Sequence, residues 1–71
     1  MAMAKIWRNR IEGGTQRLDR CPAKYRPTVI TLIQEDLESG AFTDSQLRGL
    51  VEDGMMSEAE YEEITGNPYE A

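Results

Sequence analysis

The strongest constraint on the fold of this 71-residue chain is a pair of similar turn signals that lie 14 residues apart. Each signal has a glycine, an apolar residue two positions later, then a threonine or serine, and a glutamine or glutamate three positions further on. Such a glycine closes a helix in the left-handed conformation, and the later pair forms a capping box that starts the next helix. The two sets are Gly40, Phe42, Thr43 and Gln46, and Gly54, Met56, Ser57 and Glu60. We therefore predict two helix-turn-helix units that repeat every 14 residues.

The spacing of apolar residues supplies the remaining elements and predicts an all-α single domain over residues 1–71. The first helix has an apolar stripe along one face, and the last is stopped by Gly66, which Asn67 and Pro68 follow. The stripe consists of Met3, Ile6, Trp7 and Ile11. The four short helices are expected at about residues 2–12, 27–39, 44–53 and 58–65.

The second of these helices has a competing interpretation. Residues 29–33 are rich in β-branched side chains, which favour a strand. A helix is favoured because the apolar stripe continues with helical spacing to Leu37 and no turn signal interrupts it. The core of the C-terminal half is then expected to contain Leu37, Phe42, Leu47, Leu50, Val51, Met56, Tyr61 and Ile64.

Charge is divided unevenly along the chain. Residues 1–27 hold seven basic and two acidic residues, a net charge of +5, whereas residues 28–71 hold one arginine and eleven acids, a net charge of −10. An asymmetry of this size indicates either a basic segment with a partner of its own or two halves that attract each other. We therefore divide the domain into a basic N-terminal segment, residues 1–26, and an acidic helical repeat core, residues 27–69.

The acids also occupy the ends of all three C-terminal helices, where the helix dipole disfavours negative charge. We predict that the basic segment compensates for this by docking on the acidic core, either within one chain or between copies. Trp7 and Leu18 would anchor it, because exposed ion pairs alone contribute little. The residues expected to make interactions are Trp7, Arg8, Arg10, Arg17 and Arg20.

The chain contains few of the residue types that serve in catalysis or metal binding. It contains no histidine and one cysteine, Cys21, which excludes histidine-based catalysis, a closed Cys/His zinc site and an internal disulfide. Calcium loops that would start at Asp36 or Asp44 lack the glutamate required at the twelfth position, which is Leu47 or Met55. We expect no catalytic residue, no cofactor and no metal, and we expect Cys21 to be a small packing residue, buried or half-buried.

No segment has the character of a membrane span or a secretory signal. The longest uncharged apolar-rich run, residues 27–33, is far shorter than the roughly 20 residues that cross a bilayer. The first residues lack the apolar stretch of a signal peptide. We therefore expect a cytoplasmic protein.

The C-terminal half carries a more specific pattern. Residues 50–69 combine an apolar-Val pair, a Gly-x-apolar-Ser turn, the run Tyr61-x-x-Ile-Thr-Gly, and a second tyrosine, Tyr69. Together with the upstream turn, this pattern resembles the XkdX-like small proteins of phages and prophages over about residues 30–69. The chain departs from that family in some 26 additional N-terminal residues and in Met56, where isoleucine is usual.

The resemblance implies a phage or prophage origin. Members of this family lie among the tail and baseplate genes of tailed phages of Gram-positive bacteria, and no activity is established for them. The expected function is that of a non-enzymatic accessory protein that contacts a phage structural protein or another copy of itself, in the host cytoplasm or in the virion. The alternative is a small nucleic-acid-associated regulator that uses the basic segment. It is less favoured because the acidic half adjoins that segment and no recognition motif is visible.

Overall fold

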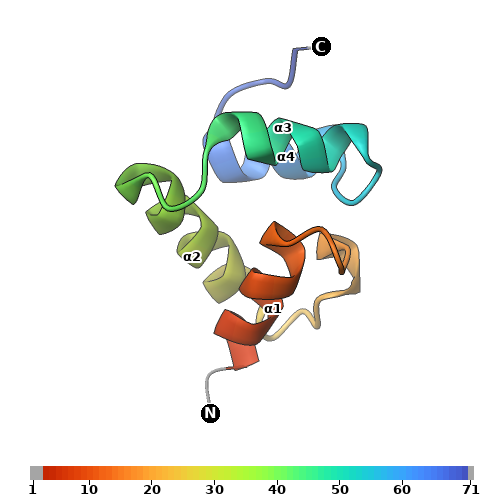
Figure 1. Cartoon of the computed structure of the whole chain (residues 1–71). Helices are drawn as coiled ribbons and strands as arrows, with labels where there is room; N and C mark the ends of the chain where they lie inside the picture. The colour runs from red at the N-terminus through yellow and green to blue at the C-terminus, as the bar shows by residue number, and fades with distance from the viewer. Residues whose placement is uncertain (1–2, 71) are drawn as a thin grey trace.

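Four α-helices and one short 3-10 helix follow one another along residues 3–70, the part of the chain that the computed structural model describes (Figure 1). No strand occurs among these residues, so the predicted all-α class is confirmed and the strand interpretation of residues 29–33 is wrong. Ala2, the first residue of the predicted first helix, lies outside the described part. The elements are α1, Met3–Glu12; η1, Leu18–Arg20; α2, Arg26–Ser39; α3, Asp44–Glu52; and α4, Glu58–Thr65.

Capping boxes start both α3 and α4. The Thr43 hydroxyl accepts a hydrogen bond from the Gln46 backbone N–H at 3.2 Å, and the Gln46 side chain accepts one from the Thr43 N–H at 2.9 Å. Ser57 and Glu60 repeat this exchange at 3.1 and 2.8 Å. Each box satisfies backbone donors that a helix start otherwise leaves unpaired, which is why the helices begin where the sequence predicts.

The two glycine turns share a left-handed glycine but close with different hydrogen bonds. Gly40 has φ 83° and Gly54 has φ 77°. After Gly54, the Met55 N–H donates to the Leu50 carbonyl at 2.9 Å, as in a Schellman motif. After Gly40, the Phe42 N–H instead reaches the Asp36 carbonyl at 3.1 Å. The 14-residue repeat therefore stays a prediction drawn from the sequence.

We expect Gly40→Ala or Gly54→Ala to lower the free energy of unfolding by about 1 kcal/mol, because alanine resists a positive φ. A β-carbon at either position would meet no other atom within 4 Å, so the cost is one of backbone conformation alone. Gly49→Ala is the matched control, since Gly49 lies inside α3, where alanine is favoured and a β-carbon also has open space. Urea denaturation should show this control to be as stable as the wild type or more so. Equal losses of unfolding free energy in all three variants would contradict the explanation by the left-handed conformation of Gly40 and Gly54.

One hydrophobic core joins all the helices. The basic N-terminal segment contributes to it directly, because Ile11 and Leu18 are fully buried and Cys21 is 7% exposed. The expected burial of Cys21 is thus confirmed. The buried residues of the core are Ile11, Leu18, Cys21, Val29, Ile30, Ile33, Phe42, Leu47, Leu50, Met56, Tyr61 and Ile64. Two residues predicted for the core, Leu37 and Val51, are only partly buried and pack against its edge.

Helix α1 buries a face that overlaps only in part with the one its apolar spacing predicts. Ile11 is in the core and Trp7 packs against it, but Met3 is 37% exposed and Ile6 is only half-buried, outside the core cluster. Ala4, which is not part of the predicted stripe, also packs against the core. This orientation also allows Arg8 of α1 to pair with Asp36 of α2, as described below.

The basic segment docks on the acidic core within a single chain. In Figure 1, α1 lies against α2, and η1 lies at the same end of the molecule. The Leu18 backbone N–H donates to the Met55 carbonyl at 3.4 Å, which ties η1 to the turn between α3 and α4. Arg26 forms ion pairs with Glu60 at 3.3 Å and Glu63 at 2.9 Å, which connect the start of α2 to α4.

Candidate functional site

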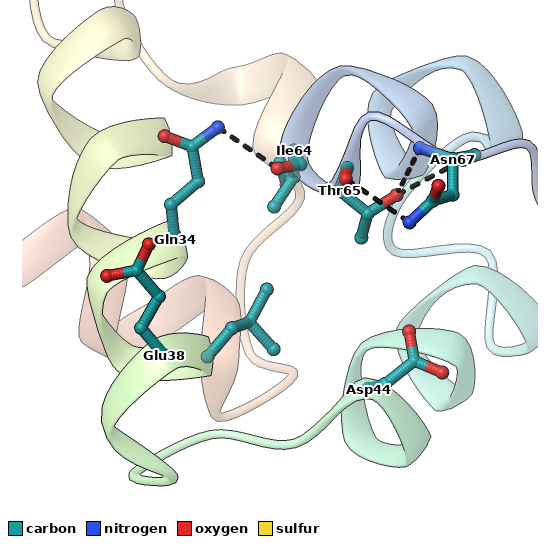
Figure 2. Close-up of a pocket in the computed structure, with 7 residues that line it drawn as sticks. Gln34, Glu38, Asp44, Ile64, Thr65 and Asn67 are labelled. Carbon is teal, nitrogen blue, oxygen red and sulfur yellow. Dashed lines mark hydrogen bonds between the residues drawn. The ribbon is translucent and has the colours of Figure 1, made fainter.

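A pocket of about 570 Å³ opens where the second half of α2, the start of α3 and the end of α4 meet (Figure 2). This volume is within the range of small-molecule and side-chain binding sites. Figure 2 shows α2 on one side of the pocket, Asp44 of α3 on another, and the end of α4 on the third. The lining residues are Gln34, Leu37, Glu38, Asp44, Ile64, Thr65 and Asn67.

At this pocket, a side chain of α2 supplies a hydrogen-bond donor for a backbone carbonyl at the end of α4. A continuing helix would use the N–H of residue 68 to pair the Ile64 carbonyl, but residue 68 is a proline and has no N–H. The Gln34 side-chain amide donates to that carbonyl at 3.0 Å instead. Gly66, with φ 75°, turns the chain away and donates its N–H to the Glu62 carbonyl at 2.8 Å. The pocket wall is thereby fixed by contacts between distant parts of the chain.

The chain after α4 is held by its own polar groups. The Thr65 hydroxyl lies within hydrogen-bond distance of the Tyr61 and Asn67 carbonyls, at 3.0 and 3.1 Å. The Asn67 N–H donates to that hydroxyl at 3.1 Å, and the Asn67 side-chain amide donates to the Thr65 carbonyl at 3.4 Å. These bonds give the lip of the pocket a defined shape.

An arginine and two tyrosines support the pocket from behind Asp44. The rings of Tyr61 and Tyr69 meet edge to face at 5.2 Å, and the Arg48 guanidinium lies 5.3 and 5.5 Å from their centres. Arg48 donates to Asp44 at 2.7 Å and to the Glu70 carbonyl at 2.6 Å. This cluster holds residues 69 and 70 against α3 and α4.

Asp44 is the acceptor that joins this cluster to the pocket. Its carboxylate receives hydrogen bonds from the Tyr61 hydroxyl and from Arg48, and these lower the pKa of Asp44. The same hydrogen bond raises the pKa of Tyr61, because it favours the protonated phenol. At neutral pH the pocket therefore contains an ionised Asp44 whose charge Arg48 compensates.

A second polar group lies at the junction of α1 and α2. Arg8 donates to Asp36 at 2.9 Å, and both side chains are less than one-fifth exposed. Glu12, on the same face of α1, has its pKa raised to about 7 by burial, then by a hydrogen bond to Asp36 and by the Asp36 charge, while Arg8 acts in the opposite direction. One Glu12 carboxyl oxygen is buried and has no hydrogen-bond partner among the described residues. Burial beside Asp36 therefore favours the protonated form of Glu12 at this junction.

The structure does not gather the five predicted interaction residues into one site. Trp7 and Arg8 face the molecule itself, whereas Arg10 and Arg20 are exposed and Arg17 pairs with Asp19 at 2.9 Å. Because part of the basic segment is already engaged by acids of the same chain, this arrangement does not favour the nucleic-acid alternative.

The predicted capping residues do not line the pocket. Gly40, Thr43, Gly54, Ser57 and Gly66 sit at helix ends and define element boundaries. Gly66 lies between two pocket-lining residues, Thr65 and Asn67, and Thr43 directly precedes another, Asp44. Sequence reasoning missed Gln34, and the available signal was Pro68, which removes the N–H that the Ile64 carbonyl needs.

The remaining chemistry is sparse. Burial raises the pKa of the Cys21 thiol, which the positive charge of Arg26 partly offsets, so the thiol is a poor nucleophile at neutral pH. Among residues 3–70, no three histidine, cysteine, aspartate or glutamate side chains are close enough to hold a metal ion. In the same part of the chain, no helix combines the length and apolar character needed to cross a membrane.

The described residues thus define a small all-α domain of four α-helices, in which a pocket lies between α2, α3 and the end of α4. The model of a family described as "Phage uncharacterised protein (Phage_XkdX)" matches residues 33–69, which is just over half of the chain. The chain belongs to this family, as the sequence resemblance indicated. No curated protein and no solved structure matches it.

Proposed function

We propose that this protein is a non-enzymatic accessory protein of the tail or baseplate region of a phage or prophage, and that it acts by contact with another phage protein. One observation carries the proposal: every residue that lines the pocket falls within the segment that matches the family. The part of the chain that defines the family is therefore also the part that offers a concave surface. The gene neighbourhood implied by the family resemblance supports the tail region as the place of action, in the host cytoplasm or in the virion.

The surface chemistry supports contact rather than catalysis. Asp44, which lines the pocket, accepts hydrogen bonds from Tyr61 and Arg48 that lower its pKa. It therefore does not exchange a proton near neutral pH. Glu12, which does titrate near neutrality, lies at the junction of α1 and α2 and is not among the pocket residues. A partly apolar pocket with fixed walls suits the recognition of a protein side chain.

Site-specific photo-crosslinking in cells that assemble the phage tests this proposal. A photoreactive residue at Asn67, which is exposed at the pocket, should form an adduct with one product of the tail or baseplate gene region. The same residue at Ala23, exposed in the turn before α2, is the control and should form no such adduct. Equal labelling from both positions, or adducts only with nucleic acid, would contradict the proposal. Purified particles should then be probed for the protein, to distinguish the cytoplasm from the virion.

A further inference from the structure

We propose that the pocket binds a lysine or arginine side chain presented by a basic partner protein. This inference rests on the proposed function, since it assumes that the partner is a protein. It goes further by naming the chemical group that enters the pocket.

The pocket offers more free hydrogen-bond acceptors than free side-chain donors, because only the second N–H of each amide, Gln34 and Asn67, is left unused. Its three side-chain donor atoms belong to Gln34, Thr65 and Asn67, and each already donates a hydrogen bond inside the chain. The Glu38 carboxylate and the side-chain carbonyl oxygens of the two amides remain as acceptors. A ligand that brings only donors, as an ammonium or guanidinium group does, is complementary to this set.

The electrostatic environment favours the same ligand. Glu38 is exposed and forms no ion pair with any residue between 3 and 70. The ends of α2 and α4 both border the pocket, and a helix C-terminus carries partial negative charge. The basic side chains of the described residues that form ion pairs do so with other acids, so none of them neutralises Glu38.

The pocket also has an apolar portion that matches the stem of a basic side chain. Leu37 is half-buried at the edge of the core and lines the pocket together with Ile64. Lysine and arginine lay their methylene groups along apolar surface while the charged end stays among polar groups. Leu37 and Ile64 would contact the methylenes, and Glu38 would pair with the charged end.

A basic partner fits better than a second copy of this chain or a metal ion. The chain has a net charge of −5, so copies repel each other as they approach. A metal ion would need several ligating side chains, and the described residues provide no such group. A separate basic protein is not repelled by the net charge of this chain, and its lysine or arginine needs only one carboxylate partner.

The test is a titration of the full-length, nitrogen-15-labelled protein with the blocked peptide Ac-Gly-Arg-Gly-NH2, followed by NMR. The side-chain amide signals of Gln34 and Asn67 should shift and saturate. The matched peptide with citrulline in place of arginine has nearly the same shape without the charge, and it should produce no saturable shift. The variant E38Q should bind the arginine peptide about fivefold more weakly, whereas E35Q, the same change at an exposed position of α2 outside the pocket, should bind as the wild type does.

Each of the following results would overturn the inference. The first is equal binding of the arginine and citrulline peptides, and the second is an equal effect of E38Q and E35Q. The third is a concentration-dependent shift of the Gln34 and Asn67 amides without peptide, which would make a second copy the occupant. If crosslinking at Asn67 captures a phage protein while the arginine peptide does not bind, the proposed function stands and the inference about the ligand is wrong.

Discussion

Leu18→Ala is expected to lower the free energy of unfolding by about 2–5 kcal/mol, as truncations of fully buried leucines do. Leu18 is 0% exposed although it lies in a short 3-10 helix within the basic segment. A domain of this size has a total stability of only about 5–10 kcal/mol, so the variant should be largely unfolded in mild denaturant. Urea denaturation followed by circular dichroism measures the loss.

Leu32→Ala is the matched control for this prediction. Leu32 lies in α2, is half-buried and does not belong to the core cluster, so the same change of side chain should cost less than about 1 kcal/mol. If both variants lose the same stability, Leu18 is not part of the core. If Leu18→Ala has no effect, the basic segment does not dock on the rest of the chain.

Glu12→Gln is expected to stabilise the protein above neutral pH and to remove most of its pH dependence between about pH 5 and pH 7. The pKa of Glu12 is raised from 4.5 to about 7 in the folded chain, mainly by burial and then by Asp36. Between these values the folded state binds a proton that the unfolded state has released. The free energy of unfolding therefore falls as the pH rises through this window, and above about 7 the full cost of an ionised Glu12 is present.

The composition makes this effect easy to isolate. The chain contains no histidine, and the pKa of Asp44 is lowered while that of the Cys21 thiol is raised, so both move away from the neutral range. Thermal or urea denaturation of the wild type at about pH 5.5 and about pH 8 should show greater stability at the lower pH. Glu12→Gln should flatten that difference, because glutamine keeps a donor for Asp36 and cannot ionise. Glu35→Gln, at an exposed position of α2, should keep the pH profile of the wild type. If the wild type is more stable at the higher pH, the pKa of Glu12 is not raised in the folded chain.

Local signals could be predicted from the sequence and distant contacts could not. The capping boxes at Thr43 and Ser57 involve residues three positions apart, so the residue types alone define them. The orientation of α1 brings Arg8 to Asp36, which lies far along the chain in α2. Apolar spacing within α1 carries no information about how the helix packs on distant residues. This is why Ile6 was predicted on the buried face and Ala4 was not.

The pocket illustrates the same limit. Its key contact joins Gln34 to the Ile64 carbonyl across 30 positions, and glutamine has no periodic signature. The family resemblance did indicate the region, since about residues 30–69 contain all of the pocket, and the family match over residues 33–69 agrees with it. It did not indicate which side chains face the pocket, because that depends on how α2, α3 and α4 pack.

The shared core has a consequence for how the protein is made. Ile11 and Leu18 leave the ribosome early, but the core in which they are buried includes Leu47 and Ile64, and η1 is tied to Met55. Until the C-terminal helices have been synthesised, the N-terminal residues have no partners to cover their apolar surface. We therefore expect this domain to fold in one cooperative step, only after α4 has been synthesised. A truncated product that stops before α4 would then remain unfolded and be a substrate for proteases of the host.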